Sequence, residues 1–276
     1  MTVRILATSD LHYSPRFDDA VRAFAREVVA EAPEVFIIAG DVGEGLPRFR
    51  ACLELFGSLP ESTLKLVVAG NHDVWTHADV PMGSRQLLDE GLPDAAHACG
   101  FRWLESESPV LRGVAFAGSL AWYDWSGVHP GVPATPERII AHKRRVWMDS
   151  WRVDWPETDP EMSARLAAGL VGRLDALESD PSVSRVFVVT HVPPWTGGLP
   201  RRPEYALTAA FFVNLGLGER LARRGKVTHA VAGHIHRHAA QHIEREGAPP
   251  IEFRIVASDY GSPAAVRFVV PEGPTR

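Results

Sequence analysis

The chain has 276 residues, of which 45% are hydrophobic and 23% are charged, and its formal net charge is −5. This composition is typical of a globular protein with one large domain, and the negative charge gives no general reason to expect a nucleic-acid-binding protein. Two cysteines cannot build a disulfide framework, no apolar stretch approaches the length of a membrane span, and the N-terminus lacks a signal-peptide pattern. We therefore expect a cytoplasmic protein.

Short apolar runs alternate with helical patterns in the first part of the chain. The runs at 3–8, 35–39 and 64–69 are rich in Val, Ile, Leu and Ala, as strands buried on both faces are. Apolar residues at helical spacing predict helices at 18–32 and 47–59. This order predicts a layered α/β domain, in which the functional crevice lies beyond the carboxyl ends of the strands.

The middle of the chain interrupts this alternation. The segment 119–160 contains five of the eight Trp residues and a basic run at 142–145, and it is longer than a regular crossover needs. We interpret it as a Trp-rich insertion that could cover the site as a cap. Two interpretations of its Trp residues stay open: they contact a substrate, or they form a small core of the insertion itself.

The alternation then resumes. A helix is predicted at 159–179, with Asp159 as its cap, and strands are predicted at 186–190 and 229–232. The C-terminal part predicts two strands around a turn at 259–263, which we expect to extend a second sheet. Because no low-complexity linker is present, residues 1–276 are expected to form a single domain.

Polar residues with metal-ligand chemistry follow the ends of the five apolar runs. In chain order they are Asp10, His12, Asp41, Asn71, His191, His234 and His236. A lone Asp at such a point is usually a turn or cap residue, but caps do not call for histidines. So many carboxylates and imidazoles at one edge of a sheet would be costly to desolvate unless a cation were bound.

The ligand types also constrain the metal. A mixed set of oxygen and nitrogen ligands without cysteine suits Mn, Fe, Zn, Co or Ni better than Ca. Seven ligands exceed one tetrahedral site, whereas two metals that share a bridging carboxylate would use them all. Two such ions, about 3.5–4 Å apart, can clamp an in-line displacement at phosphorus.

Five short blocks of the sequence resemble the motifs of the calcineurin-like metallophosphoesterases. They are DLH (10–12), GD (40–41), GNHD (70–73), the single His191 in THVPP, and GHIH (233–236). All five occur in the family's order and span most of the chain. The resemblance implies an α/β fold in which helices flank a layered sandwich of two mixed β-sheets, here with the Trp-rich cap inserted.

The resemblance also implies a role for each matching residue. One metal would be held by Asp10, His12 and His236, the other by Asn71, His191 and His234, and Asp41 would bridge both. The two ions would be divalent or of mixed valence, with Mn as the expected occupant and Fe, Zn, Ni, Co and Mg as alternatives. His72 would act as general acid for the leaving oxygen or stabilise charge on the phosphoryl group, and Asp73 would orient His72 through a hydrogen bond. Gly40, Gly70 and Gly233 would let the backbone turn tightly at the metals.

The implied activity is hydrolysis of a phosphate mono- or diester through in-line attack by a metal-bound hydroxide. We expect a small-molecule substrate, contacted by Asn71, Tyr123, Arg144 and Trp195. The loop that carries Trp195 also contains Arg201 and Arg202, which could line the pocket.

Two alternatives remain open at this stage. A nuclease would use a basic stripe built from the runs at 142–145, 201–202 and 223–226. A protein-binding scaffold that has lost catalysis should lack ligands or His72, and none is missing here. No membrane insertion is expected, and the sequence leaves the oligomeric state open.

Overall fold

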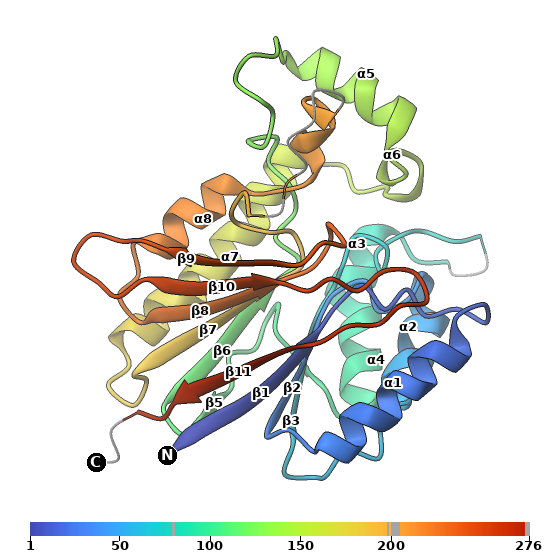
Figure 1. Cartoon of the computed structure of the whole chain (residues 1–276). Coiled ribbons are helices and arrows are strands. Elements are labelled where there is room, and N and C mark those ends of the chain that lie inside the picture. The colour runs from blue at the N-terminus through green and yellow to red at the C-terminus, as the bar shows by residue number, and fades with distance from the viewer. Residues whose placement is uncertain (79–80, 198, 200–204, 274–276) are drawn as a thin grey trace.

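Two β-sheets packed face to face form the centre of the protein (Figure 1). The structure is a computed structural model that describes residues 1–78, 81–197, 199 and 205–273. The first sheet has the strand order β11-β1-β2-β3-β4 and the second has the order β5-β6-β7-β8-β10-β9. The strands are β1 (Thr2–Thr8), β2 (Val35–Ala39), β3 (Leu64–Val68), β4 (Arg102–Trp103), β5 (Val110–Leu111), β6 (Val114–Ser119), β7 (Arg185–Thr190), β8 (Val227–Ala232), β9 (Ala239–Ile243), β10 (Ile251–Ile255) and β11 (Val266–Pro271).

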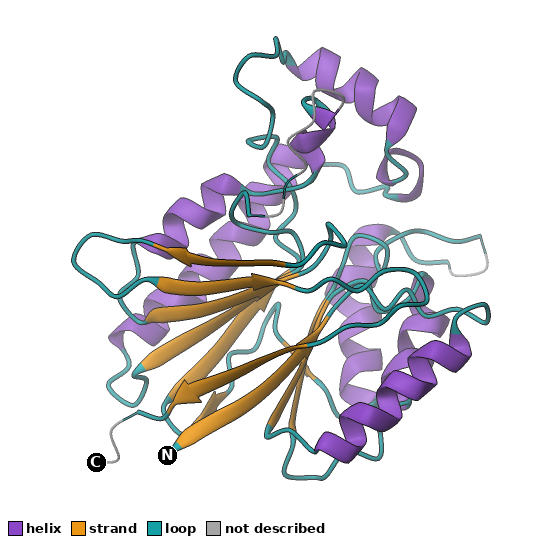
Figure 2. Cartoon of the chain, in the orientation of Figure 1, coloured by secondary structure: helices purple, strands orange, loops and turns teal. Residues whose placement is uncertain are grey.

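Helices cover the outer faces of both sheets (Figure 2). They are α1 (Asp18–Glu31), α2 (Gly45–Glu54), α3 (Ser84–Gln86), the π-helix η1 (Leu87–Gly91), α4 (Leu92–Ala98), α5 (Pro136–Val146), α6 (Asp149–Arg152), α7 (Asp159–Ser179), the 3-10 helix η3 (Thr208–Phe211) and α8 (Leu215–Ala222). Helices α1, α2 and α4 lie on the first sheet, and α7 and α8 lie on the second. None of the helices in the described parts of the chain has the length and hydrophobicity that a membrane crossing requires.

The core follows the two-residue period of the strands. In β2, Val35 and Ile37 pack between the sheets, whereas Phe36 and Ile38 pack under α1 and α2. All four side chains are fully buried. Each buried side chain of this kind contributes about 1.5–3 kcal/mol, which explains why the short apolar runs predict buried strands correctly.

Parallel pairing brings the ends of the central strands to one edge. Strands β1, β2, β3 and β4 are parallel neighbours, and so are β6, β7, β8 and β10. The antiparallel pairings of β11 with β1, β5 with β6, and β9 with β10 make both sheets mixed. The expected sandwich of two mixed sheets flanked by helices is therefore confirmed.

The two C-terminal strands do not extend one sheet, contrary to the expectation. Strand β10 joins the second sheet beside β8, whereas β11 pairs with β1 at the edge of the first sheet. The connection between them crosses from one sheet to the other. Local sequence patterns predict that a strand forms but do not say which distant strand it pairs with.

The 119–160 segment lies between β6 and α7 and carries α5 and α6, which lie beyond the carboxyl ends of the strands (Figure 1). Trp122 and Tyr123 are fully buried, and Trp155 packs edge-on against Trp122. These residues belong to the buried cluster that also contains the side chains under α1 and α2, so this part of the segment packs into the main core and does not form a core of its own. Helix α7 is capped by Thr158, which forms a capping box with Glu161, rather than by Asp159.

Candidate metal centre

The seven residues that follow strand ends come together at the edge where the central strands end. Asp10 N donates to the Gly40 carbonyl oxygen and His12 N to the Asp41 carbonyl oxygen, both at 3.0 Å, so the loops after β1 and β2 stay paired beyond the sheet. Among the described residues, nine other than glycine have a positive φ, and five of these belong to the set: Asp10, His12, Asp41, His234 and His236, with φ between 42° and 73°. Backbone strain of this kind concentrates at functional sites because the surrounding structure must hold it in place.

Asp10, His12 and His236 form the first group of side chains. The two imidazole Nε2 atoms of His12 and His236 lie 3.1 Å apart, and His236 Nε2 lies 3.5 Å from Asp10 Oδ1. The other nitrogen of His236, Nδ1, donates to Asp259 Oδ1 at 2.9 Å. That bond leaves the lone pair of His236 Nε2 directed at its neighbours, as in the carboxylate–histidine arrangement common around metals. Burial lowers the pKa of His12 to about 3, so this ring is neutral.

Asn71, His191 and His234 form the second group. Asn71 Oδ1 lies 3.0 Å from both His191 Nε2 and His234 Nδ1. The remaining ring nitrogens donate to main-chain carbonyl oxygens: His191 Nδ1 to Ala39 at 2.9 Å and His234 Nε2 to Phe211 at 2.8 Å. When both rings are neutral, as ligation of a cation requires, acceptor atoms of all three residues converge. Such a cluster is unfavourable alone and fits a bound cation.

Asp41 lies between the two groups. Its Oδ1 is 3.4 Å from His191 Nε2 and its Oδ2 is 3.6 Å from His12 Nε2. Burial alone raises the pKa of the Asp41 carboxyl, but the charges of His191 and His72 outweigh burial and hold the pKa well below its usual range. Burial alone likewise lowers the pKa of His191, but Asp41 outweighs it and raises the pKa to about 9. The buried carboxylate thus requires positive charge beside it, which a metal ion would supply.

The donor set as a whole fits metal ions. Three sets of ligand atoms each lie within 4.8 Å of one another: Asp10, His12 and His236; His12, Asp41 and His72; and Asp10, Asp41 and His191. The structure therefore contains candidate metal-binding groups on both sides of Asp41. The mixture of oxygen and nitrogen donors, without cysteine, suits divalent first-row metals.

The loop at 233–236 separates its two histidines. Strand β8 ends at Ala232, and the positive φ of both histidines turns His234 toward Asn71 and His236 toward His12. Ile235 between them packs against the core under α7 and α8. An extended chain would have placed both histidines on one face.

Three glycines stand where the site leaves no room for a side chain. A Cβ atom would collide with the His191 ring at Gly40, with Asp41 at Gly70, and with Ser9 and Asp10 at Gly233. Only Gly40 also has a positive φ, 84°. The expected need for glycine therefore comes from backbone conformation as well as space at Gly40. At Gly70 and Gly233 it comes from the lack of room for a Cβ atom alone.

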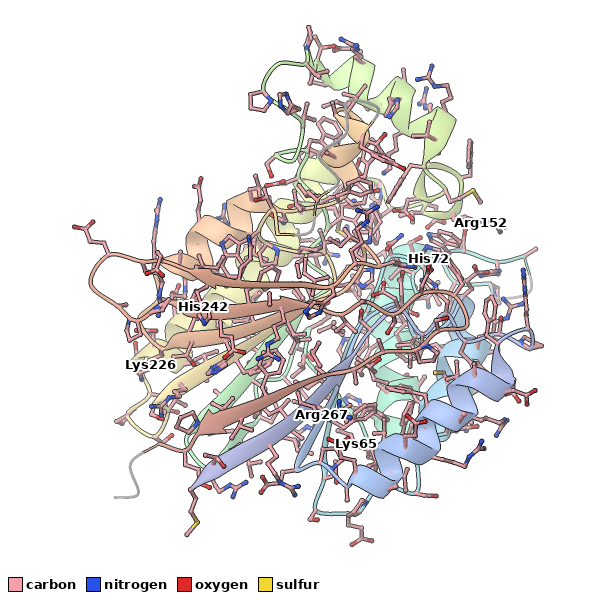
Figure 3. All side chains as sticks on the ribbon, in the orientation of Figure 1. Lys65, His72, Arg152, Lys226, His242 and Arg267 are labelled. Atoms are coloured by element: carbon pink, nitrogen blue, oxygen red, sulfur yellow. The ribbon has the colours of Figure 1, made fainter. Side chains whose placement is uncertain are left out.

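His72 lies beside the two groups, at the end of the sheets that faces α5 and α6 (Figure 3). Its ring stacks on Trp75, with centroids 3.7 Å apart. Its Nε2 lies 3.9 Å from Asp41 Oδ2 and its Nδ1 lies 3.8 Å from Glu44 Oε1. Burial alone lowers the pKa of His72, but Asp41 and Glu44 outweigh it and raise the pKa.

Asp73 does not form the expected hydrogen bond with His72. Its carboxylate accepts backbone N–H bonds from Gly70 at 2.8 Å, Gly43 at 3.0 Å and Val42 at 3.3 Å, and it does not bond to the His72 ring. Asp73 therefore fastens the loops after β2 and β3 to each other. Glu44, at the start of α2, is the carboxylate nearest to His72 Nδ1.

A cavity of about 460 Å³ opens over these residues. Its walls include Trp75, Trp147, Met148, Asp149 and Tyr260, beside the predicted ligands. The Tyr260 ring stacks on His12, with centroids 4.2 Å apart. Asp149, Glu44, Asp259 and Tyr260 lie outside the motif blocks. Glu44 is in the loop after β2, and Asp259 and Tyr260 follow β10, but their contacts with the site are made only in the folded chain.

Three of the four expected substrate contacts lie away from this cavity, and only Asn71 lines it. Tyr123 is fully buried and donates to Asp149 Oδ2 at 3.0 Å. Trp195 packs against Phe253 of β10, with centroids 4.9 Å apart. Arg144 lines a separate hollow beside Trp155. Arg201 and Arg202 lie outside the described residues.

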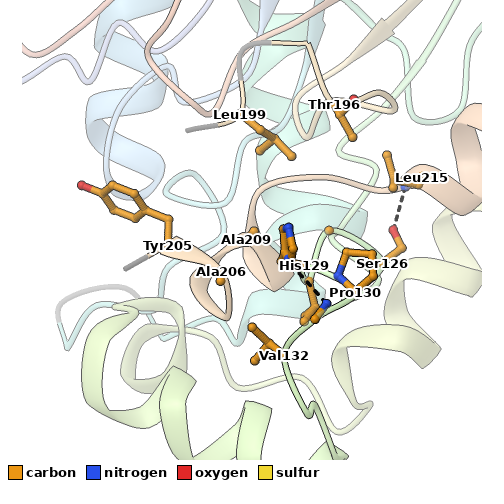
Figure 4. Close-up of a pocket in the computed structure, with 13 residues that line it drawn as sticks. Ser126, His129, Pro130, Val132, Thr196, Leu199, Tyr205, Ala206, Ala209 and Leu215 are labelled. Carbon is orange, nitrogen blue, oxygen red and sulfur yellow. Dashed lines mark hydrogen bonds between the residues drawn. The ribbon is translucent and has the colours of Figure 1, made fainter. Parts of the chain in front are cut away.

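A second cavity, of about 780 Å³, lies between the loop at 126–132 and the region around η3 (Figure 4). Its described lining includes Val128, Val132, Leu199 and Ala209. Within the part of the chain that the structure describes, no residue lines both this cavity and the one over the candidate metal groups. Helix η3 borders the second cavity through Ala209, and the carbonyl oxygen of its Phe211 accepts a bond from His234.

Known structures with the same fold have been solved. A phosphopantetheinyl hydrolase from Mycobacterium tuberculosis is 22% identical, with a TM-score of 0.70 over 94% of this chain and 90% of that one. A dimetal phosphatase from Danio rerio is 15% identical, with a TM-score of 0.55 over 96% and 91%. A protein from Thermus thermophilus is 14% identical, with a TM-score of 0.51 over 92% and 89%. At these identities the similarity establishes the fold alone.

Comparison at the level of sequence gives the family. No curated protein matches the chain. The family model of the calcineurin-like phosphoesterases matches residues 3–238, which include all five motif blocks and all seven residues of the site. The chain therefore belongs to the calcineurin-like phosphoesterase family.

Proposed function

We propose that this protein hydrolyses a phosphate mono- or diester of a small molecule with two divalent metal ions. Asp10, His12 and His236 would hold one ion, Asn71, His191 and His234 the other, and Asp41 would bridge them. The observation that carries this proposal is the position of Asp41. One of its carboxylate oxygens faces His12 and the other faces His191, so each group of ligands receives one oxygen.

Two ions bound there would lower the pKa of a water molecule and neutralise charge on the phosphoryl oxygens of the ester. The side chains of the site would orient the ester and supply the proton. Asn71 and the fixed imidazoles would orient the ester for in-line displacement. His72, which lines the cavity beside Asp41, would give a proton to the leaving oxygen.

The wall of the cavity favours an ester with an apolar or ring-bearing organic group. Trp147 and Met148 line it, and Met148 is 45% exposed and Tyr260 47% exposed. Exposed apolar side chains at the mouth of a pocket commonly pack against ligand. Because a phosphopantetheinyl hydrolase shares the fold, a phosphopantetheinyl ester belongs among the substrates tested.

Mn²⁺ is the proposed occupant, because the oxygen and nitrogen donors suit it, with Fe, Zn, Ni, Co and Mg as alternatives. Cys52 and Cys99 are both free thiols, which supports the proposal of a reducing, cytoplasmic location.

The test is a substrate panel with metal-free protein reloaded with each metal in turn. The panel contains an aryl phosphomonoester, a bis-aryl phosphodiester, cyclic nucleotides and a phosphopantetheinyl ester. We expect hydrolysis of at least one ester that requires two metal equivalents. Protein that binds two metals and hydrolyses none of these esters with any of the six metals would contradict the proposal.

The basic runs argue for a small ester rather than a polymer. Lys143 forms an ion pair with Asp159 at 2.6 Å, and Arg224 one with Asp175 at 2.6 Å. The run at 223–226 precedes β8 and so lies at the opposite edge of the sheet from His234. The run at 201–202 is outside the described residues. Cleavage of oligonucleotides that falls steeply as salt rises would favour a nuclease instead.

A further inference from the structure

Asp149 is a buried carboxylate of α6 that touches the candidate metal centre. It is 1% exposed and lines the cavity over the predicted ligands. Four side-chain donors surround it: Asn71 Nδ2 at 2.9 Å, Trp75 Nε1 at 2.6 Å, Trp147 Nε1 at 2.8 Å and the Tyr123 hydroxyl at 3.0 Å. A buried carboxylate is costly unless its oxygens are satisfied, and here both accept two hydrogen bonds.

The two oxygens of Asp149 divide these donors between two parts of the chain. Oδ1 accepts from Asn71 and Trp75, which belong to the loop after β3. Oδ2 accepts from Tyr123 and Trp147, which belong to the 119–160 segment. This carboxylate therefore fastens the segment to the loop that carries Asn71 and His72.

The bond to Asn71 decides which end of its amide faces the imidazoles. An Asn amide has an acceptor and a donor end of nearly the same shape. Because Asp149 can only accept, it holds Nδ2 and leaves Oδ1 toward His191 and His234, at 3.0 Å from each. With the amide reversed, an NH₂ group would face the metal position, and an NH₂ group cannot ligate a cation.

Asp149 also fixes the tryptophan beside His72. Trp75 donates to Asp149 and stacks on the His72 ring. The same carboxylate thus restrains a predicted metal ligand and the aromatic support of the predicted general acid.

We infer that Asp149 is a positioning residue, which holds the Asn71 amide in its metal-binding orientation and couples the 119–160 segment to the metal centre. This inference rests on the proposed function, because it takes Asn71 as a ligand. Loss of a group that orients a metal ligand typically weakens metal binding about 10- to 100-fold.

The experiment measures Mn²⁺ binding by calorimetry to metal-free full-length protein, with tryptophan emission recorded alongside. Asp149→Asn keeps the shape but presents an NH₂ group to donors on one side. We expect one of the two Mn²⁺ equivalents to bind about 10- to 100-fold more weakly, and the emission to shift as either Trp75 or Trp147 loses its acceptor. Tyr123→Phe removes a single donor and keeps the ring, and it should weaken the same equivalent about 3- to 10-fold.

Asp159 provides a matched control. Its carboxylate is 7% exposed and also accepts from two indoles, Trp122 Nε1 at 2.8 Å and Trp125 Nε1 at 3.0 Å, but it touches none of the predicted ligands. Asp159→Asn should shift the emission and leave both Mn²⁺ affinities within about twofold of wild type.

The outcomes separate the inference from the proposed function. Wild-type protein that binds fewer than two metals contradicts the proposed function. If wild type binds two and Asp149→Asn binds both with unchanged affinity, the inference is wrong. If Asp149→Asn does not fold, unchanged Mn²⁺ affinity in Tyr123→Phe overturns it. An equal loss of Mn²⁺ affinity in Asp159→Asn also overturns it, because the effect would then be general destabilisation.

Discussion

His234 donates from Nε2 to the main-chain carbonyl oxygen of Phe211, 2.8 Å away, and this bond fixes which nitrogen faces the site. Nδ1 is thereby left with its lone pair toward Asn71 Oδ1, at 3.0 Å. Burial lowers the pKa of His234 to about 4, which keeps the ring neutral and its lone pair available. The 3-10 helix η3, far from any motif in the sequence, thus sets the tautomer of a predicted ligand.

Replacing Asp41 tests whether the two groups act as one centre. Asp41→Asn keeps the shape but removes the charge that lies between His12 and His191. We expect the Mn²⁺ content to fall from two equivalents to one or fewer and the rate of ester hydrolysis to fall at least about 10³-fold. Metal analysis and a hydrolysis assay measure both. A variant that keeps two metals and full activity would show that Asp41 is not the bridge. If the protein were a catalytically inactive scaffold, Asp41→Asn would leave its binding to a protein partner unchanged.

Replacing His72 tests its role as proton donor. With His72→Ala we expect kcat to fall about 10²- to 10⁴-fold for an alkyl ester, whose leaving oxygen needs a proton. The loss should be much smaller for a 4-nitrophenyl ester, whose leaving group departs as an anion. Metal content, measured in the same samples, should stay at two equivalents. Equal losses for both esters would exclude general-acid catalysis by His72.

We expect Asp73 to stabilise the fold and not to orient His72, the proposed proton donor. Asp73→Asn retains one acceptor oxygen for the three backbone N–H groups of Gly70, Gly43 and Val42. We expect a loss of about 1–3 kcal/mol in the free energy of unfolding, measured on metal-free protein by urea titration. Unchanged stability, with a loss of activity that depends on the leaving group as in His72→Ala, would restore the originally expected role.

The stability of the protein should depend on pH through Glu105. Burial raises the pKa of this side chain to about 7, although Leu120 N donates to its carboxylate. Because the folded-state pKa is raised, the stabilising contribution is complete below about pH 4.5 and is lost as pH rises toward 7. Glu105→Gln cannot ionise and can still accept the Leu120 bond. Its Tm should exceed that of wild type at pH 8 by about 2–4 °C, if about 1 kcal/mol is recovered, and by less at pH 5.

Glu107 gives the opposite sign and serves as the control for Glu105. Burial alone raises the pKa of Glu107, but bonds with His97, the Trp103 amide and Arg102 outweigh it and lower the pKa. Its stabilising contribution is therefore present above about pH 4.5 and is lost as pH falls through its lowered pKa. Glu107→Gln should lower the Tm at pH 8. A Tm that falls in both variants would mean that Glu105 is not destabilising when charged.

Much of the fold follows from local pattern. The runs that become β1, β2, β3, β7 and β8 are apolar enough to be buried on both faces, and the helical stripes of α1, α2 and α7 lie where the spacing predicts them. The sheet that receives β11 was not predictable in this way, because strand pairing depends on distant residues.

The sequence by itself determined the residue types of the metal centre. Asp10, Asp41, Asn71, His191 and His234 each follow a strand closely along the chain, so strand order alone gathers them at one edge. Only the tertiary structure decided how these side chains are held. The Phe211 carbonyl oxygen accepts from His234, Asp259 accepts from His236, and Asp149 accepts from Asn71. Asp73 accepts from backbone amides and not from the His72 ring. These partners are up to 78 residues from the groups that they orient, and no local pattern encodes a contact made only when separate loops pack together.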